Sequence, residues 1–382
     1  MANDIILETQ TPRRRRTRVV LALLAIAGLI GGWGILGGRP DIWPARVLIP
    51  IDRLSSPLAF SPDGRTLLSA GGGGIIPWDA STGKMGIPWT SQQGLYVGKG
   101  IYSPDGRTFA AADSGHPSQG TIELIDPVIG RSRATLSLQN PIVHDLAFAD
   151  GGRTLRAFLG DGTNLKEAAT WDVATGQKTS SRPLTPPTKL AITAFSPDGR
   201  VLALIPWKST SIQLWDLETD RLLGNLTDPS WTFEIGPGLD FSPDGRTLAV
   251  ARGDDGEIDL WDVPGRKRLR TIRVHPRKQT SWSIQFAPDG RTFASVACES
   301  GPKSALAQAY EDLGWKLFGT ISQPSSELVV VDIATSRRIA RTASSGFEFY
   351  SPDGRSIATR GGDFTVQIRD LPDRPAAKES RP

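Results

Sequence analysis

The amino-acid sequence predicts an all-β protein built from seven repeated four-stranded units, with one transmembrane helix in front of them. Three observations support this prediction. A six-residue motif ending in Gly-Arg recurs seven times, a second motif ending in Asp follows each copy, and residues 19–38 contain no charged side chain. Repetition at a nearly fixed interval indicates units that each bury their apolar faces against a neighbour.

Residues 19–38 form the first predicted element, a transmembrane helix. At 1.5 Å per residue a helix of this length spans about 30 Å, the thickness of a hydrocarbon core. Five arginines precede it within residues 1–18, so the positive-inside rule places that basic segment in the cytoplasm and the rest of the chain outside it. The alternative is a cleaved signal peptide, whose apolar core is usually shorter and ends at a small-x-small site.

Glycines within this span bear on oligomerisation. Gly28 and Gly32, and again Gly34 and Gly38, have the GxxxG spacing that permits close helix–helix approach. Six glycines among these twenty residues also produce the spacing by chance, so the oligomeric state is left open.

The net charge of +4 and the pI of about 9.3 belong to the ends of the chain. Residues 1–18 hold five arginines against two acids, and residues 372–382 hold three basic side chains against two acids. Everything between is neutral, so the sequence predicts no nucleic-acid partner. The single cysteine, Cys298, excludes an internal disulfide and a multi-thiolate metal site.

The repeated motif is an aromatic residue followed by Ser-Pro-Asp-Gly-Arg or a close variant. Its copies begin at Phe60, Tyr102, Phe148, Phe195, Phe241, Phe286 and Tyr350, at intervals of 42–47 residues except for the last, of 64. The second signature reads Trp78-Asp79, Ile125-Asp126, Trp171-Asp172, Trp215-Asp216, Trp261-Asp262, Val331-Asp332 and Arg369-Asp370. Seven paired motifs in register define seven units.

Each unit is predicted to contain four short strands, a to d. An apolar strand a leads into Pro-Asp-Gly, where Pro presets φ, Asp bonds its own backbone and Gly takes the left-handed conformation. Strand b follows, and strand c runs with period-two alternation into the second signature, as in residues 211–215. Strand d comes after a Thr-Gly turn, as in residues 221–226.

These paired motifs resemble the WD40-repeat β-propeller family over residues 45–371. The resemblance implies a seven-bladed β-propeller in which the tryptophans of the second signature pack between blades. The Gly-His pair that the family carries between strands d and a is absent from every repeat. The buried His–Trp hydrogen-bond network of eukaryotic members is therefore not expected.

The last unit lacks a strand d, because only the polar tail 372–382, expected to be disordered, follows it. Residues 46–51 form an unpaired strand between the linker 39–45 and the first unit. We expect this strand to occupy the outer position of the seventh blade, closing the ring and covering its open edge. The propeller then spans residues 46–371.

In the family's topology the a–b and c–d turns share one face, and the b–c and d–a loops share the other. The first face is uniform in sequence and expected to be structural, whereas the second carries an insertion near residues 299–326 of blade six. Candidate partner-binding residues on the second face are Tyr310, Trp315, Phe318, Trp231, Trp282, His275 and Arg277. The alternatives are that the insertion packs on blade six and that both Trp231 and Trp282 are blade-interface residues.

No GxSxG, HExxH or P-loop motif is present, so the sequence predicts a non-catalytic protein-interaction module without metal or cofactor. One alternative is an extracytoplasmic enzyme with a metal or cofactor in the central channel. A weaker alternative is an anionic lipid or polyanion binder that uses the basic run 266–278. Against this, basic side chains on an outer strand also prevent edge pairing and match the acidic strand c beside them.

Overall fold

The structure is a computed structural model that describes residues 45–48, 56–71, 74–90, 97–113, 120–138, 142–161, 164–189, 192–206, 209–219, 221–229, 231, 238–252, 255–276, 279–299, 326–344, 348–360 and 365–372. Within these residues no helix is both long and apolar enough to cross a membrane. The predicted anchor, residues 19–38, lies outside them, as do residues 300–325 of the insertion.

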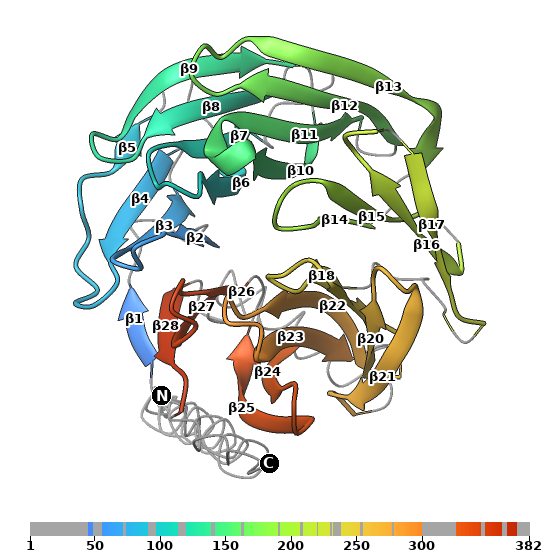
Figure 1. Ribbon diagram of the computed structural model, residues 1–382. Helices are drawn as coiled ribbons and strands as arrows, with labels where there is room; N and C mark the ends of the chain where they lie inside the picture. The colour runs from blue at the N-terminus through green and yellow to red at the C-terminus, as the bar shows by residue number, and fades with distance from the viewer. Residues whose placement is uncertain are drawn as a thin grey trace, which may run out of the picture. The chain divides into compact units, whose positions relative to one another are not determined.

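The described residues form 28 strands in seven four-stranded antiparallel sheets, which are the blades of one ring (Figure 1). Blades one to three contain β2 (Ser56–Phe60), β3 (Thr66–Gly71), β4 (Gly74–Asp79), β5 (Trp89–Thr90); β6 (Val97–Tyr102), β7 (Phe109–Asp113), β8 (Thr121–Asp126), β9 (Arg131–Ser137); and β10 (Ile142–Ala149), β11 (Thr154–Gly160), β12 (Asn164–Asp172), β13 (Lys178–Lys189). A short 3-10 helix, η1 (Asp150–Gly152), replaces the usual turn between β10 and β11.

Blades four to six contain β14 (Ile192–Phe195), β15 (Val201–Ile205), β16 (Ser211–Asp216), β17 (Arg221–Thr227); β18 (Leu239–Phe241), β19 (Thr247–Ala251), β20 (Glu257–Asp262), β21 (Lys267–Arg273); and β22 (Gln279–Phe286), β23 (Thr292–Glu299), β24 (Ser326–Asp332), β25 (Arg337–Ser344). Blade seven contains β26 (Glu348–Tyr350), β27 (Ser356–Arg360), β28 (Val366–Asp370) and β1 (Ala45–Leu48). In all seven blades strand c ends at the Asp of the second signature. The predicted all-β, seven-bladed propeller is confirmed.

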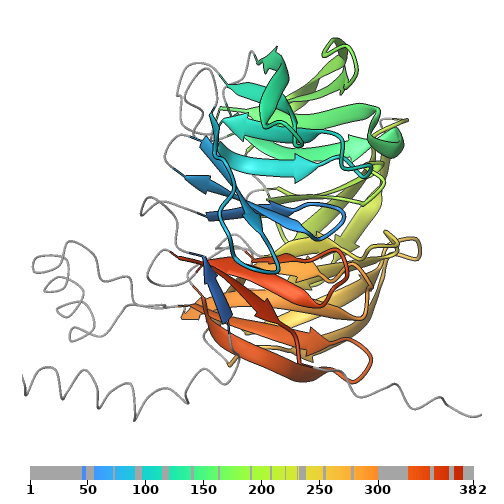
Figure 2. The ribbon, with the colours of Figure 1, turned by 90° about the vertical axis from the view of Figure 1, so that its left-hand side faces the viewer.

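The ring closes through β1, which pairs antiparallel with β28 and places Val47 opposite Gln367. Figure 2 shows β1 in blue beside the red strands of the last blade. Leu48 is buried and packs with Trp78 of blade one and Ile368 of blade seven. This pairing confirms the closure that the sequence predicts.

The hydrophobic core lies between adjacent blades, as stacked sheets require. Trp171 packs with Ile122 of the preceding blade, and Trp261 packs with Leu214 of the preceding blade. The half-buried Trp215 likewise contacts the cluster that contains Phe158 of blade three. In the four blades that carry it, the tryptophan of the second signature therefore joins the blade to the one before it.

The a–b turns are held by hydrogen bonds within each turn and also contact the previous blade. Ser61 Oγ donates to Asp63 Oδ1 at 2.6 Å, and Arg65 N donates to the same oxygen at 3.0 Å. The Ser61 hydroxyl bond is the largest cause of the lowered pKa of Asp63. Gly64 has φ +70°, and a Cβ there would lie 3.6 Å from Pro352 Cδ of blade seven. The turn residues thus serve the turn itself and the contact with the previous blade.

Candidate interaction surface

Trp231, a predicted partner contact, is instead a core residue. Its side chain is 1% exposed, its Nε1 donates to Asp259 Oδ2 at 3.0 Å, and its ring centroid lies 5.2 Å from that of Trp261. The prediction of a partner contact is therefore wrong for this residue, and the blade-interface alternative holds. The physical reason is the buried carboxylate, which requires a donor where the d–a connection passes over blade five.

Asp259 is the centre of a buried ionic cluster. Its carboxylate accepts hydrogen bonds from Trp231 Nε1 and Thr271 Oγ1, and Arg252 Nε lies 3.7 Å from Oδ2. Arg268 Nη1 lies 3.9 Å from the same oxygen. A buried charge is tolerated only when such partners surround it.

Trp231→Phe is expected to reduce the free energy of unfolding by at least about 1.5–3 kcal/mol, because the phenyl ring cannot donate the hydrogen bond to the buried carboxylate and also fills less of the buried site. Urea unfolding of the purified chain measures this change. Trp215→Phe is the matched control: its Nε1 donates to the neutral Gln213 side chain at a half-buried position, so about 0.5–1.5 kcal/mol is expected. Equal losses in the two variants would contradict the role given to Asp259.

His275 is also buried, which corrects its prediction as a partner contact. Its Nε2 lies 3.0 Å from Ser295 Oγ, and that hydroxyl lies 2.6 Å from Ser281 Oγ. Burial, with a smaller contribution from Arg338, lowers the pKa of His275 to about 4. The imidazole is therefore neutral at physiological pH and joins the connection after β21 to strand b of blade six.

Buried tryptophan and histidine side chains make hydrogen bonds to strand b although the Gly-His pair is missing. In blade one Trp78 Nε1 donates to Ser69 Oγ at 2.9 Å, and in blade six His275 contacts the equivalent strand b through Ser295. In blade six the tryptophan position is Val331. The tryptophan–serine contact and the histidine–serine contact thus lie in different blades.

The remaining candidate residues stay predictions. Trp282 lies in β22, and its side chain is outside the described part of the structure. Arg277, Tyr310, Trp315 and Phe318 also lie outside the described residues.

The basic run 266–278 is largely engaged within the fold. Arg273 forms an ion pair with Glu257 on the neighbouring strand. Arg268 forms an ion pair with Asp228, which follows the outer strand of blade four. Arg270 donates to the carbonyl oxygen of Ile333. These contacts support the structural interpretation of the run over a lipid or polyanion site there.

The innermost strands line the centre of the ring (Figure 1), and polar contacts join some neighbouring blades there. Lys99 Nζ lies 3.2 Å from Asp145 Oδ1, while Phe286 N donates to Asp240 Oδ2 at 2.6 Å. Among the described residues no group of three His, Cys, Asp or Glu side chains is placed to hold a metal ion. Lys99, Asp145 and Asp240 thus make contacts between neighbouring blades.

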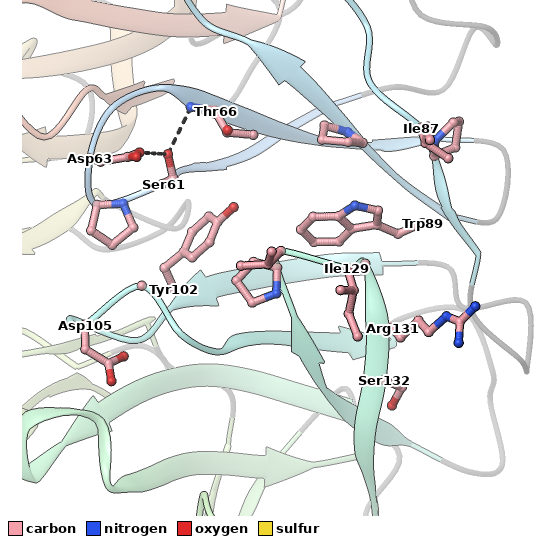
Figure 3. A pocket seen from close by; sticks show the side chains of 17 residues that line it. Ser61, Asp63, Thr66, Ile87, Trp89, Tyr102, Asp105, Ile129, Arg131 and Ser132 are labelled. Atoms are coloured by element: carbon pink, nitrogen blue, oxygen red, sulfur yellow. Dashed lines mark hydrogen bonds between the residues drawn. The ribbon is translucent and has the colours of Figure 1, made fainter.

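The turn face, which carries the a–b and c–d turns, contains a feature that sequence reasoning missed. A groove of about 1190 Å³ lies between blades one and two, with Trp89 and Tyr102 lining it (Figure 3). Beside it Ile87, Val128 and Ile129 are 86%, 90% and 64% exposed. The turn face is therefore not uniform.

The local cause is the sequence of two c–d turns. Blade two has Pro127-Val-Ile-Gly130 where blade one has Ala80-Ser-Thr-Gly83. A Cβ at Gly130 would lie 2.2 Å from Trp89 Cδ1, so only glycine lets this turn approach blade one so closely. The close approach seats the turn on Trp89 and leaves Val128 and Ile129 exposed.

Comparison with known proteins identifies one repeat. Residues 237–262 match the family described as WD domain, G-beta repeat, a span that covers β18, β19 and β20 of blade five. No curated protein matches the chain. The matched repeat lies in one of seven blades that carry the same paired motifs, which supports a WD40-type propeller fold.

Proposed function

We propose that the chain is a membrane-anchored, non-catalytic scaffold that binds a protein partner through its loop face, which carries the b–c and d–a connections. The observation that carries this proposal is the unequal length of those connections. Strands b and c are joined from Gly71 to Gly74 in blade one but from Glu299 to Ser326 in blade six. Loops that vary on a rigid scaffold are where binding specificity commonly lies.

The apolar span 19–38 and the arginines before it support the anchor. In this arrangement residues 1–18 are cytoplasmic and the propeller is extracytoplasmic. Resistance of the full chain to alkaline extraction from membranes tests the anchor, and release into the soluble fraction contradicts it.

The family match favours scaffolding over catalysis, because WD40 propellers are typically interaction modules. The partnered polar groups near the centre of the ring favour it too. Purified chain that contains a stoichiometric metal or a coloured cofactor would support the enzymatic alternative instead.

Replacing residues 300–325 with a short Gly-Ser connection tests the loop face. We expect proximity labelling in native membranes to lose specific partners while the thermal unfolding of the ring is unchanged. Leu269→Ser, at an exposed position on outer strand β21, is the control that should keep those partners. An unchanged set of labelled partners in the loop variant would contradict this function.

A further inference from the structure

The direction of β1 determines which face of the ring the N-terminal segment enters. Ala45 pairs with Arg369 and Leu48 with Val366, so β1 runs opposite to β28. Because β28 ends at Asp370, where c–d turns begin in the other blades, Ala45 lies at the turn face. The chain therefore reaches the propeller from the turn face.

Few residues separate the proposed anchor from that face. Residues 39–44 lie between the end of the apolar span and Ala45. Fully extended, the chain from residue 38 to residue 45 covers at most about 25 Å. With an anchor that ends at residue 38, this length limits how far Ala45 can lie from the membrane.

Exposed apolar side chains concentrate at the c–d connections of blades one and two. Among the described residues, seven large hydrophobic side chains are exposed, and four of them follow strand c in blades one and two: Met85, Ile87, Val128 and Ile129. We call these four the apolar patch. A Cβ at Gly83 would lie 3.0 Å from Leu48 Cδ2, so the c–d turn of blade one touches β1 itself.

Basic side chains surround the turn face. Each a–b turn carries an exposed arginine: Arg65, Arg107, Arg153, Arg200, Arg246, Arg291 and Arg355. Of these, Arg200 forms ion pairs with the carboxylates of Asp216 and Glu218. The accompanying carboxylates bond back to their own turns, as Asp63 does through Ser61 and Arg65 N. Exposed guanidinium groups bind phosphate well, and they accompany apolar side chains on surfaces that lie in a membrane interface.

We propose that the turn face docks on the phospholipid surface of the membrane that holds the anchor. The apolar patch enters the headgroup region, and the arginines of the a–b turns bind lipid phosphates. This inference rests on the proposed anchor and deepens the proposed function, because it directs the loop face away from the membrane toward the partner.

The test uses the full chain in vesicles of phosphatidylcholine and phosphatidylglycerol, with Cys298→Ser removing the native thiol. A fluorophore on Val128→Cys reports the turn face. A fluorophore on Ser137→Cys is the matched control, because Ser137 is exposed at the other end of β9 in the same blade. Nitroxide attached to lipid near the headgroup quenches fluorophores at the membrane surface.

We expect the fluorophore at residue 128 to be quenched several-fold more than the one at residue 137. Adding Ile87→Ser and Ile129→Ser should reduce this quenching, whereas Leu222→Ser and Leu223→Ser, on outer strand β17, should not. Equal quenching at 128 and 137, in protein that floats with the vesicles, overturns the docking and leaves the anchor intact. Protein that fails to float overturns the anchor and the docking together.

Discussion

Leu48→Ala is expected to lower the free energy of unfolding by about 2–5 kcal/mol, the range for removing a fully buried leucine side chain. Leu48 is 1% exposed and belongs to a cluster with Trp78, Ala80 and Ile368. Because these residues come from blades seven and one, the cavity weakens the junction where the ends of the chain meet. The ring then loses a contact that no other blade can replace.

The ion pair at the same junction should matter much less. Arg46 Nη2 lies 2.6 Å from Asp370 Oδ1, but the two side chains are 39% and 65% exposed. Exposed pairs of this kind contribute about 0–1 kcal/mol. Arg46→Gln should therefore change stability only slightly, so apolar burial dominates the closure.

Urea unfolding of the two variants and the parent chain measures both effects. Leu223→Ala, at a 40% exposed position on outer strand β17, is the control and should change stability by less than about 0.5 kcal/mol. A Leu48→Ala variant as stable as this control would show that β1 does not hold the ring together.

The repeat architecture could be predicted because its motifs recur seven times. The closure could be predicted because the first strand belongs to none of the seven repeats. The Asp of the second signature ends strand c in every blade. Blade seven lacked an outer strand, and only residues 46–51 were available to supply it. Both inferences depend on the number of strands identified in each repeat, and local sequence patterns indicate short strands well.

The roles of Trp231 and His275 could not be predicted in the same way. Each follows an outer strand, and whether its side chain turns inward depends on a polar partner distant in sequence. That partner is Asp259 for Trp231 and Ser295 for His275. No fixed sequence interval predicts either pairing. Asp259 lies on strand c of blade five, whereas Ser295 lies on strand b of blade six.

The turn face was misjudged for a different reason. Its motif turns repeat closely, which indicated a uniform and structural face. Val128 and Ile129 are visible in the sequence, but their exposure depends on how the turn seats on Trp89. The pairing direction of β1 places Ala45 at this same face.

The folded chain should lose roughly 3 kcal/mol of stability through His275 as the pH falls from 6.5 to about 4. Burial lowers the pKa of this side chain to about 4 in the folded protein, against an ordinary value of 6.5. Between these two pH values the unfolded chain binds a proton that the folded chain does not, so protonation favours unfolding. The stabilising contribution is complete above pH 6.5 and is lost as the pH approaches 4.

His275→Gln isolates this effect, because glutamine can still contact Ser295 but does not titrate. Turn aspartates such as Asp63 and Asp105 have pKa values lowered below 3.8 by hydrogen bonds from Ser61 and Ser103, so they destabilise the fold only at more acidic pH. His144, whose pKa burial also lowers, remains in both proteins. Urea unfolding at several pH values should therefore give the variant a flatter profile than the parent between pH 6.5 and 4. Identical profiles would mean that His275 becomes protonated in the folded ring without cost and would contradict this prediction.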